Sequence, residues 1–68
     1  MVNSSKLIGL FAEKNMTRER VAYELGITPN TLRRKLNQGK FDSDEMYALV
    51  KLLEIENPTP IFFANEGA

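Results

Sequence analysis

The sequence predicts an all-α protein: one compact domain, residues 1–68, made of five helices. Three observations point to this fold class. Apolar side chains recur at the i, i+3, i+4 spacing of amphipathic helices, residues with capping side chains precede these stretches, and glycine or proline separates them. A chain of 68 residues also suits a single small domain. The expected helices are residues 4–14, 17–25, 28–37, 42–54 and 60–64.

The first helix is expected to begin at Asn3 or Ser4, because either side chain can accept a hydrogen bond from a free N–H group of the first turn. Its apolar stripe consists of Leu7, Ile8, Leu10 and Phe11. Gly9 lies inside this helix, at a cost of about 1 kcal/mol relative to alanine. We expect this glycine to mark a close approach of another helix.

The second helix is expected to start at a Thr17 cap and to stop at Gly26. Glycine adopts the positive φ of such a helix end without steric cost. Ala22 is small because two helices are expected to cross there, so we assign this residue to the fold and not to a site.

The third helix follows at once, with Thr28 as its cap and Pro29 at its first position, where proline is favoured. Leu32 and Leu36 are spaced i, i+4 and are expected to point inward. The opposite face of this helix carries Asn30, Arg33, Arg34 and Asn37.

The fourth helix opens with Asp42 and Glu45 at the spacing of a capping box, in which Asp replaces the usual Ser or Thr. The side chains expected to face the core are Met46, Leu49, Val50 and Leu53, with Tyr47 and Leu52 at the edges.

A short fifth helix follows the Asn-Pro-Thr-Pro break at residues 57–60. Neighbouring helical residues point about 100° apart, so one core is not expected to accommodate both Phe62 and Phe63. One hypothesis assigns Ile61, Phe62 and Phe63 to a dimer interface. The alternative wedges both phenylalanines between the first and fourth helices. The tail, residues 65–68, is expected to be disordered.

Composition argues against several classes of function. The chain has no cysteine and no histidine, so disulfides, thiolate metal sites and the commonest general base are excluded. Glu19 and Glu24 do not form an acid–base pair, because five residues on a helix turn the side chains about 140° apart. We therefore expect no enzyme, cofactor, metal or small-molecule ligand. No apolar run approaches a membrane span and no signal peptide is visible, so a cytoplasmic location is expected.

The formal net charge is zero, which taken alone argues mildly against a nucleic-acid partner. The distribution of charge changes this interpretation. Residues 25–41 contain four basic side chains and no acid, whereas residues 42–68 contain six acids and one lysine. The simpler interpretation is that the basic residues of segment 25–41 form an ordinary solvent-exposed face. The alternative is that the third helix and the loop after it bind a polyanion.

Two helices joined across a glycine by a three- or four-residue turn describe the helix-turn-helix, whose second helix enters the DNA major groove. Residues 17–39 fit this description and resemble the Cro/repressor (XRE-type) family of phage and bacterial regulators. The residues that carry the resemblance are Ala22, Leu25, Gly26, Ile27, Leu32 and Leu36, with Asn37, Gln38, Gly39 and Lys40 after the second helix of the motif. The flanking helices also fall where the family has them.

The resemblance implies a lambda-repressor-like domain that binds double-stranded DNA and regulates transcription. The short chain is closer to a small Cro-like member than to the larger phage repressors. Such a phage or prophage repressor would act as a homodimer on a palindromic operator, with half-sites about 34 Å apart. It would be associated with the nucleoid of a bacterium or a phage-infected host.

The predicted base-reading residues are Pro29, Asn30, Arg33 and Arg34, which match the base-facing positions of the family. Arginine can bind guanine O6 and N7, and asparagine can pair with adenine. Proline offers only apolar contact, for example to a thymine methyl group. The predicted phosphate contacts are Thr17, Arg18, Thr28, Thr31, Lys35, Asn37, Gln38 and Lys40. Tyr23 is expected to pack at a rim rather than to reach a phosphate.

Two alternatives remain open. A protein–protein interaction module of the antitoxin or anti-repressor type would suit the neutral net charge. An excisionase-like accessory factor would bind and bend DNA without acting as a repressor. The acid-free segment 25–41, with its base-reading residue types, favours a DNA-binding regulator over the first alternative.

Overall fold

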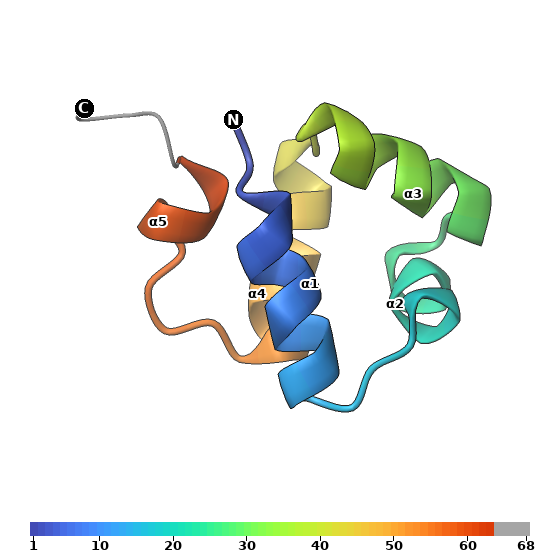
Figure 1. Cartoon of the computed structure of the whole chain (residues 1–68), viewed down its shortest axis with the longest axis horizontal. Coiled ribbons are helices and arrows are strands. Elements are labelled where there is room, and N and C mark those ends of the chain that lie inside the picture. The colour runs from blue at the N-terminus through green and yellow to red at the C-terminus, as the bar shows by residue number, and fades with distance from the viewer. Residues whose placement is uncertain (64–68) are drawn as a thin grey trace.

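A computed structural model describes residues 1–63 of the chain. It contains five helices and, within those residues, no strand (Figure 1). The helices are α1 (Ser4–Glu13), α2 (Arg18–Leu25), α3 (Pro29–Gln38), α4 (Ser43–Leu53) and α5 (Thr59–Phe62). The all-α, five-helix prediction is confirmed, and every helix begins within one residue of its predicted start. The tail that we expected to be disordered, residues 65–68, lies outside the described residues.

Side-chain caps fix where the first four helices begin. Asn3 caps α1, which decides between the two predicted candidates, and its side chain accepts a hydrogen bond from the N–H of Lys6. Thr17 and Thr28 cap α2 and α3 in the same way. Asp42 and Glu45 form the predicted capping box at the start of α4. Each cap satisfies a backbone donor that has no partner within its own helix.

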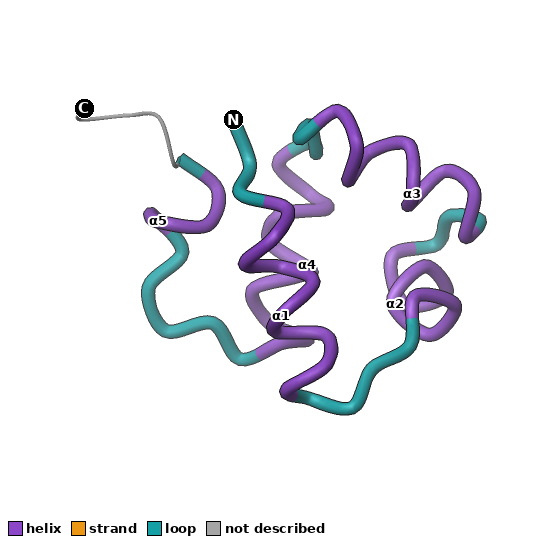
Figure 2. The backbone as a smooth tube through the Cα atoms, in the orientation of Figure 1, coloured by secondary structure: helices purple, strands orange, loops and turns teal. Residues whose placement is uncertain are grey.

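The core draws on every helix. Its fully buried side chains come from α1, α2, α3 and α4, and α5 adds two nearly buried ones. The buried apolar residues are Val2, Leu7, Phe11, Val21, Ala22, Leu32, Leu36, Phe41, Leu49, Leu53, Ile61 and Phe62. Helix α2 packs against both α3 and α4, and α1 packs against α5. Helix α3 thus lies at the outside of the body, supported by α2 (Figures 1 and 2).

Residues 2–4, just before and at the start of α1, connect the end of α3 to the rest of the protein. The N–H of Val2 donates to the carbonyl of Gly39 at 3.0 Å, and the hydroxyl of Ser4 donates to the carbonyl of Leu36. The N–H of Asn3 donates to the carbonyl of Ile61 in α5 at 2.6 Å. The first few residues therefore connect α3 and α5, which are far apart in the sequence.

Three expectations about single side chains were wrong. Ile8 is 36% exposed, because Leu7 and Phe11 define the buried face of α1 and Ile8 lies about 100° away from Leu7. Tyr23 is 79% exposed and does not pack at a rim, since its neighbours Val21 and Ala22 fill the inward positions of α2. An added Cβ at Gly9 would meet nothing within 4 Å, so no helix approaches this glycine closely.

The two adjacent phenylalanines of the C-terminal segment have different environments. Ile61 and Phe62 are buried within this chain, whereas Phe63 is 42% exposed. This agrees with the expectation that one core does not accommodate both rings, and it contradicts the alternative in which both are wedged between helices. Of the three residues predicted for a dimer interface, Phe63 is the one that presents substantial apolar surface to solvent.

Replacement by alanine is expected to have opposite effects on stability at Gly9 and at Gly26. A Cβ has open space at both, but Gly26 has φ +73° whereas Gly9 has helical geometry. Gly9→Ala is expected to stabilise the protein by about 0.5–1 kcal/mol, because alanine loses less backbone entropy in a helix. Gly26→Ala is expected to destabilise it by about 1–2 kcal/mol, because L-residues are strained at positive φ. Urea unfolding followed by circular dichroism measures both, and equal signs for the two variants would contradict the assigned geometry.

Candidate nucleic-acid interface

Helix α3 has one buried face and one exposed face. Leu32 is fully buried and Leu36 is 5% exposed, and together they fix the rotation of the helix about its axis. The side chains of Asn30, Arg33, Arg34 and Asn37 are all exposed. They lie within an arc of about 100° on the side away from the two leucines, because successive residues turn by about 100°. This row, which includes the predicted base-reading residues Asn30, Arg33 and Arg34, therefore faces solvent along one side of α3, and Pro29 is exposed at its start.

The corner between α2 and α3 is held by backbone hydrogen bonds. Gly26 adopts the left-handed conformation, and its N–H donates to the end of α2. The N–H of Ile27 donates to the carbonyl of Ala22 at 3.0 Å. Thr28 then caps α3, with Pro29 in its first turn. Residues 26–28 are the whole connection between the helices (Figure 2), so α3 has little freedom to change its angle to α2.

Two members of the exposed row contact each other. The Nη2 of Arg33 donates a hydrogen bond to the Oδ1 of Asn30 at 3.3 Å. This contact spans one turn of α3 and orders two flexible side chains on the surface. It leaves most of the guanidinium donors of Arg33 available, since arginine has five N–H donors.

The basic side chains of residues 25–41 differ in their partners. Among the described residues, Arg33, Arg34 and Lys40 form no ion pair. Lys35 is different, because its Nζ lies 3.0 Å from the Oε1 of Glu45. The positive charge that is available on α3 and after it therefore comes from two arginines and one lysine.

The predicted phosphate-contact residues are mostly at the surface. The exposed ones are Thr17, Arg18, Thr28, Asn37, Gln38 and Lys40, and the half-buried ones are Thr31 and Lys35. The hydroxyl of Thr28 donates to the Oγ1 of Thr31 at 2.9 Å. Its hydrogen is therefore engaged, and the hydroxyl hydrogen of Thr31 is the better placed of the two for a phosphate oxygen.

The helix N-termini differ in their suitability for an anion. Free N–H groups and the helix dipole favour a negative charge at such an end. The first turn of α3 contains no acid, whereas Asp44 and Glu45 lie in the first turn of α4 and Asp42 caps it. The protein's own carboxylates thus occupy the start of α4, and the start of α3 is the more favourable position for a phosphate.

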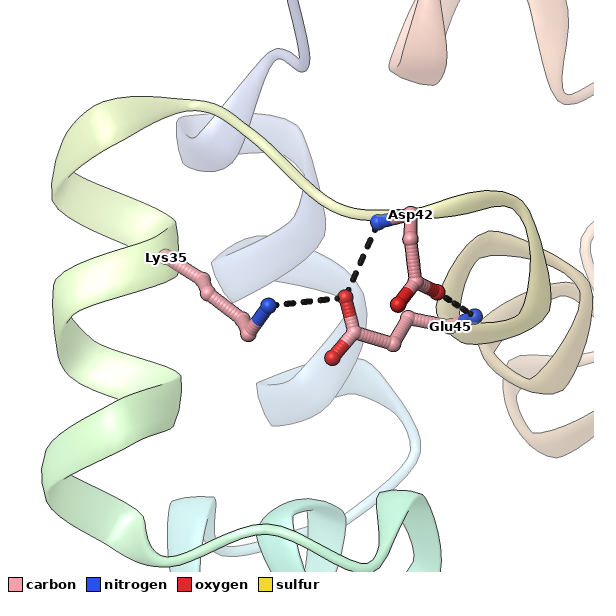
Figure 3. Close-up of polar contacts among 3 residues, drawn as sticks. All are labelled: Lys35, Asp42 and Glu45. Atoms are coloured by element: carbon pink, nitrogen blue, oxygen red, sulfur yellow. Dashed lines mark hydrogen bonds and ion pairs between the residues drawn. The ribbon is translucent and has the colours of Figure 1, made fainter.

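The sequence indicated Lys35 and Glu45 separately but not their contact. Glu45 was expected to serve the capping box, and Lys35 was expected to contact a phosphate. Their pairing depends on how α3 and α4 are rotated toward each other across residues 39–42 (Figure 3). The available signal was the helical phase of Lys35, which places it on the flank of α3 and away from the reading row.

Residues 12–39 match the family model for the bacterial regulatory protein, Fis family. The matched segment contains α2, the glycine corner and α3. This supports a bacterial helix-turn-helix DNA-binding regulator. The match covers less than half of the chain and does not extend to the Cro/repressor (XRE-type) family. No curated protein and no solved structure shows a significant match to the chain.

Residues 1–63 contain no cluster of three or more side chains that could hold a metal ion. None of the helices in this range has the length and hydropathy needed to span a bilayer.

Proposed function

We propose that the chain is a sequence-specific regulator of transcription that reads the major groove of double-stranded DNA with α3. The finer proposal is a Cro-like repressor of a phage or prophage that acts as a dimer on a palindromic operator. One observation supports the reading of the major groove by α3. This helix is anchored by Leu32 and Leu36 and presents an exposed row of arginine and asparagine, with no acid on the same helix.

The members of the row have different proposed roles. Arg33 binds the O6 and N7 atoms of a guanine, and Asn30 pairs with an adenine. Pro29 contacts a thymine methyl group at the start of the helix. Arg34 lies at the edge of the row and serves a base or the backbone beside it. Because these residues share one side of a single helix, they would reach consecutive base pairs.

The proposed backbone contacts surround the row. Thr17 and Arg18 begin α2, where the helix dipole favours a phosphate and the charge of Glu19 in the same turn opposes one. In the proposed complex, Thr31 contacts the backbone of one DNA strand, and Gln38 and Lys40 contact the backbone of the other. Such contacts position the protein on the duplex and carry no sequence information by themselves.

The dimer is proposed because one recognition helix contacts too few base pairs to define a unique binding site. Two copies related by a two-fold axis would read both halves of a palindrome. Phe63 is a candidate for the contact between the copies, since its ring is 42% exposed beside the buried Phe62. A bound dimer would repress by covering a promoter.

Selection of bound duplexes from a random pool tests this proposal. We expect a palindromic consensus with half-site centres about 34 Å apart and an affinity that falls steeply with salt. A single unpaired half-site would contradict the dimer. Strong bending of the selected duplex would favour the excisionase-like alternative. The absence of a mobility shift even at about 50 mM salt, where non-specific binding is strengthened, would favour the protein–protein module.

A further inference from the structure

Glu45 is the one charged residue that is buried within residues 1–63, with 9% of its surface exposed. Its Oε1 accepts two hydrogen bonds, from the N–H of Asp42 at 2.9 Å and from the Nζ of Lys35 at 3.0 Å (Figure 3). The Oδ1 of Asp42 accepts from the N–H of Glu45 at 2.8 Å. One carboxylate therefore belongs both to the cap of α4 and to an ion pair with α3.

The environment of this pair differs from that of the other ion pairs in the described residues. The side chains of Lys35 and Glu45 are 21% and 11% exposed, whereas the pair between Arg20 and Glu24 is 62% and 34% exposed. Loss of the cation beside a buried carboxylate strongly destabilises a protein, so the pairing of Lys35 with Glu45 is favoured in the folded state. An exposed pair such as that in α2 contributes little.

The position of Lys35 on α3 links the ion pair to DNA binding. Helix α3 packs against α2, and the Lys35–Glu45 pair adds a polar connection from α3 to α4. Its partner also fixes the ammonium group on the flank of α3, away from Asn30 and Arg33. A lysine that was free at this position would add one contact to any phosphate, whatever the base sequence.

We propose that Glu45 is a specificity-determining positioning residue. Its ion pair with Lys35 connects α3 to α4 and keeps the ammonium group of Lys35 from contacting the DNA backbone. This inference rests on the proposed function. It replaces the phosphate contact that the sequence predicted for Lys35. Releasing Lys35 then strengthens binding to every duplex by the same added contact. It lowers specificity because it loosens the angle at which α3 presents its base-reading row.

Glu45→Gln tests this inference with little disturbance of the fold. Glutamine is accepted at this position of a capping box, so the cap of α4 is retained while the charge is lost. Fluorescence anisotropy of the full chain would be measured on the selected operator and on a random duplex between about 50 and 200 mM salt. Circular dichroism would check that each variant is folded.

Glu45→Gln is expected to steepen the dependence of log K on log salt by about 0.9 on both duplexes, as for one added phosphate contact. Its affinity would then fall about 3-fold more than that of the unmodified protein over this salt range. The ratio of operator to random affinity is expected to decrease, because the looser orientation of α3 weakens the base contacts, which only the operator makes. If Glu45 had only a structural role, its substitution would not increase the number of phosphate contacts.

Three variants serve as controls. Lys35→Gln is expected to leave the salt dependence unchanged, and the double variant Lys35→Gln/Glu45→Gln is expected to return it to that of the unmodified protein. Glu24→Gln removes one negative charge from the exposed pair on α2 and is expected to leave the ratio of affinities unchanged.

Two results would overturn the inference while leaving the proposed function intact. One is a salt dependence that Glu45→Gln does not alter. The other is a slope that Lys35→Gln lowers by about 0.9, which would show that Lys35 already contacts a phosphate. If the unmodified protein bound neither duplex at any salt concentration, the proposed function would fail, and this inference with it.

Discussion

Leu32→Ala is expected to lower the free energy of unfolding by about 2–5 kcal/mol, the cost of removing a buried leucine side chain and leaving a cavity. Leu32 is fully buried and lies on α3, directly after the corner that joins it to α2. A domain of this size has a total stability of about 3–10 kcal/mol. The substitution should therefore remove a large part of the stability, and urea unfolding followed by circular dichroism measures the loss.

Arg34→Ala is the matched control for this prediction, because Arg34 is on the same helix but exposed. Its effect on the free energy of unfolding is expected to stay within about 0.5 kcal/mol. A cost below about 1 kcal/mol for Leu32→Ala would contradict the docking of α3 described above, since removal of a buried leucine side chain costs about 2–5 kcal/mol.

The starts of the helices could be predicted because their signals are local. A cap is recognised from the residue itself and from the N–H two or three positions later. Thr17, Thr28 and Asp42 each satisfy this rule, so the predicted starts agree closely with the structure. Gly26 likewise gave the end of α2, because the positive φ that it adopts is a property of the backbone at that one position.

The exposed row of the candidate interface was predictable for a related reason. Leu32 and Leu36 are one turn apart and both must be buried, which fixes the rotation of the helix. Once that rotation is fixed, Asn30 and Arg33 have to point outward. Whether they contact DNA bases stays a prediction.

Features that depend on packing between helices could not be derived in this way. The spacing of apolar residues in α1 did not show that Ile8 lies outside the buried face, nor that the surroundings of Gly9 are open. The contact between Lys35 and Glu45 requires the relative rotation of two helices joined by a loop. Local patterns give the phase of each helix but not the neighbour that it meets.

Arg33→Ala is expected to weaken binding to the selected operator by roughly 1–3 kcal/mol, about 5- to 150-fold in Kd, and to relax the preference at one base pair. Arg33 is exposed on the reading side of α3 and forms no ion pair within residues 1–63, so its charge is available to a guanine. Repeating the selection from a random pool with this variant identifies the position that has lost its preference.

Lys40→Ala is the matched control for this second prediction. Lys40 is exposed after the end of α3 and also lacks an ion pair in the described residues. Its loss should weaken all sequences similarly and lower the salt slope by about one. If Arg33→Ala behaved like Lys40→Ala and left the operator preference unchanged, the assignment of the reading face would be wrong.

The hydrogen bond between Arg33 and Asn30 makes this test more informative. In the free protein the Oδ1 of Asn30 accepts from the Nη2 of Arg33, so each side chain helps to hold the other in place. If both read bases from this arrangement, the losses caused by Asn30→Ala and Arg33→Ala should not add in the double variant, because residues in contact are coupled. Additive losses would instead mean that the two side chains separate on DNA and act independently. In that case the base preference that each variant relaxes would still locate both residues along the groove.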